Sequence, residues 1–144
     1  MTHCFYGWKN SKIITASNPA YALKIKHPAD LYDALSKIWC EESCASRMRH
    51  LWTPENMTLG QCSITAFLAQ DIFGGRVFGV ETLEGDCHCF NSVDGVNFDL
   101  TSEQFNYDLN YKNDWEQFRE DHFRNNEKKL RYEFLKNELL KSLA

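Results

Sequence analysis

The sequence predicts an α+β protein, in which helices are combined with a meander of antiparallel strands. An apolar helical stripe over residues 62–73 ends at Gly74-Gly75, and glycine suits the left-handed backbone that closes a helix. From Arg76 onward the pattern changes to that of strands. Asp94-Gly95 then separates two strand-like segments, and this dipeptide is the strongest short-range signal of a hairpin.

Length and composition favour one domain. The chain has 144 residues, of which 43% are hydrophobic and 14% aromatic, enough for a core without disulfides or metals. Only 7 Gly and 3 Pro are present, so no linker or disordered segment is indicated. We expect a single domain over residues 1–144, with a core at about 28–110 and a C-terminal helical tract at about 114–142.

The charge pattern argues against nucleic acid and membrane partners. Lys and Arg number 16 against 20 Asp and Glu, a net charge of −4, and the only dense basic run, residues 128–131, lies in a Glu-rich helical stretch. No apolar run reaches the roughly 18 residues that span a bilayer. The N-terminus lacks the pattern of a secretion signal, so we expect six reduced cysteines and a cytoplasmic location.

The other elements follow from local signals. A helix is expected from Pro28 to about Trp39, because proline suits a first turn and apolar residues recur at helical spacing. Strands are expected over residues 76–83, 87–93 and 96–100. Residues 101–104 have the pattern of a capping box that opens a short helix. A long helical tract would start near Asp114 and bend or split at Asn125-Asn126.

Cys62 is a candidate nucleophile because it stands where a helix should begin. The free N–H groups and positive dipole of a first turn favour the thiolate, and the same N–H groups can hold an oxyanion. A cysteine at this position can equally be a small core residue.

The hairpin supplies a second and third candidate. A two-residue turn at Asp94-Gly95 predicts the facing pairs Val93–Val96, Asn91–Phe98 and Phe90–Asp99. Because side chains alternate along a strand, His88 and Asp99 would share a face and lie within hydrogen-bonding reach. Asn91 is a rival orienting residue that this register turns to the opposite face, and a one-residue slip would reverse that assignment. Taken singly, His88 could be a core histidine and Asp99 a helix cap.

Residues 60–105 resemble the YunG-like family of small bacterial proteins. The resemblance rests on a set of short motifs, namely Gly60-Gln61-Cys62, Thr65-Ala66, Gln70-Asp71, Phe73-Gly74-Gly75, His88, Asn91, Gly95 and residues 99–105. It covers about a third of the chain closely, and it implies a fold and a site without naming a substrate.

The order of Gly60-Gln61-Cys62, then His88, then Asp99 is more distantly similar to that of transglutaminases and other papain-like enzymes. This similarity implies a papain-like core, in which a buried helix that carries the cysteine packs on a small antiparallel sheet. It also implies that Cys62 is the nucleophile, His88 the base and acid, and Asp99 the orienting carboxylate.

The chain departs from transglutaminases because Ser63 replaces an aromatic residue after the cysteine and because the core is shorter. Three further residues are candidates for the oxyanion site or for positioning: Gln61, Trp52 and Asn91. The function expected from this reading is a cysteine-dependent hydrolase or acyltransferase that acts on an amide- or acyl-bearing protein, peptide or small molecule. No cofactor is expected.

Two other classes compete with this hypothesis. A metal-binding protein is the first class, because Cys and His residues occur at 87–89 and at Cys40 and Cys44, with His50 nearby. Neighbouring residues of a strand face opposite ways, however, and no Cys-x-x-Cys knuckle is present. We therefore expect no metal. A non-catalytic binding module that retains the fold is the other class, with a homodimer through the C-terminal helix as one possible use.

Overall fold

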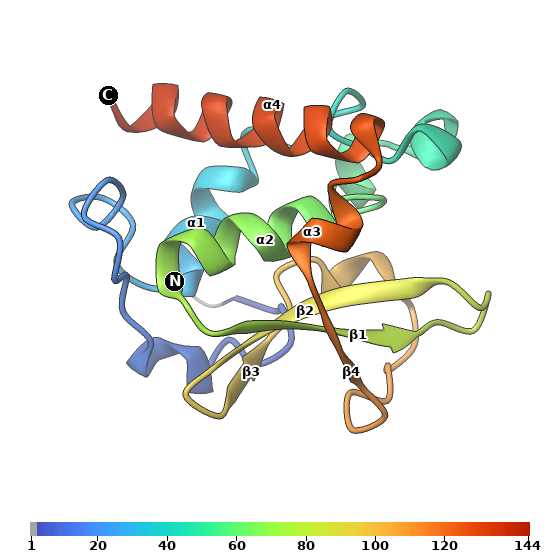
Figure 1. Cartoon of the computed structure of the whole chain (residues 1–144), viewed down its shortest axis with the longest axis horizontal. Coiled ribbons are helices and arrows are strands. Elements are labelled where there is room, and N and C mark those ends of the chain that lie inside the picture. The colour runs from blue at the N-terminus through green and yellow to red at the C-terminus, as the bar shows by residue number, and fades with distance from the viewer. Residues whose placement is uncertain (1–2) are drawn as a thin grey trace.

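The structure is a computed structural model, and it describes residues 3–144. It is an α+β fold with a four-stranded antiparallel sheet in the order β3-β2-β1-β4. Helix α2 lies on one face of the sheet, and the C-terminal helix α4 lies above α2 (Figure 1). The bounds are α1 Pro28–Leu35, α2 Cys62–Phe73, β1 Arg76–Glu81, β2 Cys87–Val93, β3 Val96–Phe98, β4 Trp115–Gln117, α3 Arg119–His122 and α4 Asn126–Leu143.

Helix α2 begins and ends where the sequence predicts. Nine of its residues are buried, because it packs between the sheet below and α4 above. Gly74 closes the helix with a positive φ of 79°, and Gly75 follows with 74°. The N-cap, Gln61, makes no capping hydrogen bond with its side chain. The first turn therefore keeps backbone N–H groups that no N-cap side chain satisfies.

The hairpin between β2 and β3 has the predicted register. Asn91 pairs with Phe98, and Val93 pairs with Val96. Asp94 and Gly95 both have positive φ, 51° and 81°, as a type I′ turn requires. The turn sequence therefore fixes which side chains of the two strands share a face.

The predicted helical tract at 114–142 is wrong in its first third. Trp115–Gln117 forms β4, which pairs with Val77–Gly79 of β1 and satisfies the hydrogen bonds of that strand's free edge. The chain then forms the short helix α3 before α4. Asn125 is the point of division, because its side chain accepts a hydrogen bond from Lys128 N and caps α4.

Three other elements, α1, β1 and β3, end earlier than predicted. Helix α1 ends at Leu35 and is followed by turns. Strand β1 ends at Glu81, because Thr82 N bonds to the carbonyl of Asp86 in the turn, and β3 ends at Phe98. Residues Ser102–Gln104 form a single 3-10 turn in which Thr101 makes no side-chain cap, so the expected capping box does not form.

The C-terminal helices are attached to α2 through a partly buried polar cluster. Arg119 donates to Asp71 Oδ1 at 2.7 Å and to the carbonyl of Phe67 at 3.2 Å. Tyr132 of α4 donates to the other oxygen of Asp71. One carboxylate of α2 thereby holds both α3 and α4. Over residues 3–144, no helix is long and apolar enough to cross a membrane.

Gly75→Ala should destabilise the fold more than Gly95→Ala. Both glycines have positive φ, so each substitution carries strain of about 1 kcal/mol. A Cβ on Gly75 would also lie 2.3 Å from the carbonyl oxygen of Ser92, whereas a Cβ on Gly95 meets nothing within 4 Å. Urea unfolding should show a further loss of about 1–3 kcal/mol for Gly75→Ala. Equal midpoints for the two variants would contradict this.

Candidate active site

Cys62 and His88 line a groove of about 860 Å³. The groove lies at the N-terminal ends of α2 and α4, beside the turn between β1 and β2. Most of its wall comes from the segments 45–51, 82–87, 104–107 and 122–131. A partly exposed thiol at the start of a helix therefore faces a space that a small molecule or an extended chain can enter.

His88 and Asp99 are joined as the hairpin predicts. His88 Nε2 lies 2.7 Å from Asp99 Oδ2, and the two side chains are 2% and 1% exposed. Because Nε2 is held by the carboxylate, Nδ1 is the ring nitrogen that remains for the thiol. Phe105 packs edge-on against the imidazole, with the ring centroids 4.7 Å apart. The imidazole is thus fixed in orientation by a carboxylate and an aromatic ring.

Asp99 is itself held by hydrogen bonds on both oxygens. Thr101 donates its N–H to Oδ1 at 3.1 Å, a local bond from the residue two positions further along the chain. Tyr111 donates its hydroxyl to Oδ2 at 2.7 Å. The ring of Tyr111 stacks on Tyr6 at 3.8 Å, and Tyr6 O accepts the backbone N–H of Asp99. The N-terminal segment therefore helps to fix the position of the Asp99 carboxylate.

The surroundings of Cys62 favour its thiolate. Hydrogen bonding from Cys89, and then the positive charge and hydrogen bond of His88, lower the pKa of Cys62 well below its ordinary value despite the cost of burial. The same hydrogen bond, in which Cys89 is the donor, raises the pKa of Cys89 well above its usual value. The chemical consequence is a thiol that ionises more readily than an ordinary cysteine.

His88 is held in its charged form. Burial favours the neutral imidazole, but the negative charges of Asp99 and Cys62 and their hydrogen bonds outweigh it and raise the pKa of His88 to about 10. The site therefore favours a thiolate–imidazolium pair, which is the arrangement that activates cysteine nucleophiles.

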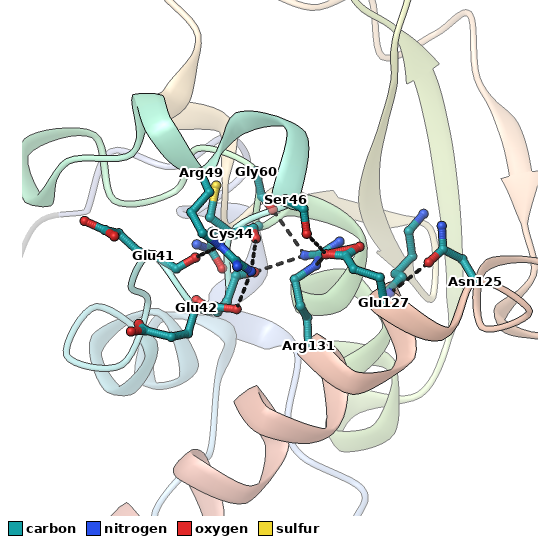
Figure 2. Close-up of polar contacts among 12 residues, drawn as sticks. Glu41, Glu42, Cys44, Ser46, Arg49, Gly60, Asn125, Glu127 and Arg131 are labelled. Atoms are coloured by element: carbon teal, nitrogen blue, oxygen red, sulfur yellow. Dashed lines mark hydrogen bonds and ion pairs between the residues drawn. The ribbon is translucent and has the colours of Figure 1, made fainter.

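The loop that precedes Cys62 is fixed by α4. Arg131, which is buried, donates to the carbonyls of Ser43 at 3.0 Å and Gly60 at 3.4 Å, and it is ion-paired with Glu127 (Figure 2). Glu127 also accepts the hydroxyl of Ser46 at 2.9 Å. Gly60 has a φ of +72°, and a Cβ there would lie 2.5 Å from the sulfur of Cys44. The loop's conformation thus requires glycine just before Gln61-Cys62.

The three positioning candidates lie outside the groove lining. Gln61 is fully buried and donates to the carbonyl of Cys40 at 3.1 Å. The indole N–H of Trp52 donates to the carbonyl of Met57 at 3.0 Å. Asn91 faces α2, as the register predicts, and donates to the carbonyl of Ala66 at 2.8 Å. Each of the three side chains donates to a main-chain carbonyl and none lines the groove, so the backbone N–H groups in the first turn of α2 are better placed as oxyanion donors.

Sequence reasoning missed several residues that the fold brings to the site. Tyr111 and Tyr6 reach Asp99 from segments without a periodic pattern, and the concentration of aromatic residues at 105–111 is the one signal that could have drawn attention to Tyr111. His122 and Lys128 line the groove beside the thiol. In the sequence, both residues belong to one helical pattern, which gives no sign that they meet at the groove.

The candidate metal ligands do not assemble. Within residues 3–144, no group of three or more His, Cys, Asp or Glu side chains is arranged to hold a metal ion. All six cysteines are free thiols.

Comparison with known proteins places the chain in a family. Residues 27–144 match the family described as YunG protein, which is most of the chain, so the protein belongs to the YunG family. It is 38% identical over 78 residues to the "Uncharacterized protein YunG" of Bacillus subtilis (strain 168), an alignment that spans 54% of this chain and 63% of that relative. No solved structure matches the chain.

Asp99→Asn should make Cys62 a more ordinary thiol. The substitution removes the negative charge that holds the pKa of His88 at about 10, so that pKa falls. Less imidazolium is then available to stabilise the thiolate, and the pKa of Cys62 rises. The pH midpoint of Cys62 alkylation by iodoacetamide, followed by peptide mass spectrometry, should move upward.

Tyr111→Phe is the matched control, because it removes a hydrogen bond to Asp99 but leaves the charge in place. Its midpoint should stay near that of the unmodified protein. If Asp99→Asn gives the same midpoint as the unmodified protein, the carboxylate does not act on the thiol.

Proposed function

We propose that the protein is a cysteine-dependent hydrolase or acyltransferase that acts on amide bonds. The observation that carries this proposal is the place of the Cys62 thiol, which lies at a helix N-terminus beside a buried His88–Asp99 pair and lines a groove. These surroundings lower the pKa of Cys62. In these roles Cys62 is the nucleophile, His88 the acid and base, and Asp99 the positioning carboxylate.

The reaction would proceed in two stages. The thiolate of Cys62 attacks the carbonyl carbon, a C–S bond forms, and first-turn N–H groups of α2 stabilise the oxyanion. The imidazolium of His88 gives its proton to the leaving amine as the C–N bond breaks. His88 then takes a proton from water, or from an acceptor amine, which attacks the thioester and restores the thiol.

A relation to papain-like enzymes is part of the proposal. It is supported by the chain order Cys62, His88, Asp99 and by the packing of the cysteine helix on an antiparallel sheet. We also propose a cytoplasmic location, which the six free thiols support.

Acylation by p-nitrophenyl acetate tests the proposal directly. Cys62 should acquire an acetyl group, detected by peptide mass spectrometry, with release of p-nitrophenolate, and Cys62→Ser should abolish this reaction. His88→Gln should slow acylation by about 10²–10⁴-fold, the usual contribution of a positioned proton-transfer group.

Cys4 is the internal control, because it is an exposed thiol with none of these neighbours in the site. Thermal unfolding of His88→Gln would show whether the variant retains its fold. If Cys62 is acetylated no faster than Cys4, and His88→Gln leaves that rate unchanged, the protein is better described as a non-catalytic binding module.

A further inference from the structure

Lys128 differs from the other cations that line the groove because it has no acidic partner. Arg131 is ion-paired with Glu127, and Arg47 is paired with Asp86 at 3.4 Å. Over the part of the chain that the structure describes, Lys128 makes no ion pair. An ammonium group without a counter-charge therefore faces the same space as the thiol.

The position of Lys128 is fixed by a second histidine. Lys128 Nζ donates to His122 Nδ1 at 2.9 Å, and His122 Nε2 donates to Gln117 Oε1 at 2.7 Å. Burial, and next the charge of Lys128, lower the pKa of His122, so this imidazole is neutral and acts as an acceptor for the ammonium. A neutral acceptor orients the lysine without cancelling its charge, and two of its three N–H groups stay available.

The ammonium opens onto the same groove as the reacting groups. Lys128 and its partner His122 line this groove together with Cys62 and His88. A small substrate bound in the groove can therefore contact Lys128 and Cys62 together.

The remaining charges of the groove do not compete for this position. Glu127 is occupied by Arg131 and Ser46. Glu84 belongs to the turn between β1 and β2 and accepts the hydroxyl of Tyr107 at 3.1 Å. The negative groups are thus paired or belong to a different wall of the groove.

We propose that Lys128, held by His122, is a carboxylate-binding residue, and that the substrate is an amide that carries a free carboxylate near its scissile bond. This inference rests on the proposed function, because it names the substrate class of the same site. It assigns Lys128 to specificity and leaves the chemical step to Cys62 and His88.

Two alkylating reagents of nearly equal size test the proposal. Iodoacetate carries a carboxylate and iodoacetamide is neutral, so the ratio of their rates at Cys62 reports an anion-binding group beside the thiol. The ratio is measured at about pH 8.5, where lysine is charged and even an ordinary thiol reacts. Lys128→Met should lower this ratio by about threefold to tenfold, the effect of one partly screened charge, and the ratio cancels any change in the reactivity of the thiol itself because both reagents react with the same thiolate.

Lys129→Met is the matched control, because Lys129 is the next residue of α4, is exposed and does not line the groove. It should leave the ratio unchanged, and about 1 M salt should reduce the ratio of the unmodified protein towards that of Lys128→Met. An unchanged ratio in Lys128→Met, or an equal fall in Lys129→Met, would overturn the proposal.

The same reagents separate this inference from the proposed function. An iodoacetamide rate at about pH 6.5 that is equal for Cys62 and Cys4 would contradict an activated thiol. The rate ratio at the higher pH would still be readable, because it does not require the thiol to be activated.

Discussion

The hydrogen bond between His88 and Asp99 is the contact around which the site is arranged. It joins β2 to the residue that follows β3, and both partners are almost fully buried. A buried pair of this kind needs its remaining polar atoms satisfied, and Thr101 and Tyr111 do this for the carboxylate. The imidazole that results is charged, and together with the hydrogen bond from Cys89, which is the larger effect, it lowers the pKa of Cys62.

The parts that could be predicted from the sequence are those fixed by local interactions. Helix α2 has the predicted bounds because an apolar stripe and a glycine pair lie within 14 consecutive residues, 62–75. The His88–Asp99 contact was predictable because Asp94-Gly95 sets the register of both strands, whatever else packs on them.

The parts that could not be predicted depend on distant segments. Strand β4 exists because β1 offers it a free edge some 40 residues earlier, and a helical pattern in residues 114–118 carries no information about that edge. Tyr6 and Tyr111 reach Asp99 through loops, and the pairing of Lys128 with His122 needs the break at Asn125. Each of these features depends on a tertiary contact that the local sequence pattern does not indicate.

The first turn of α2 has no side-chain cap, although a cap would stabilise the helix. A Ser, Thr, Asp or Asn at the position of Gln61 would typically add about 1 kcal/mol by bonding to the first-turn N–H groups. The chain forgoes that gain, and Gln61 turns its amide to Cys40 instead. Rigidity at this point comes from elsewhere, through Arg131 and the packing of α4. A helix end that would be a defect in a purely structural element is thereby left open to a ligand.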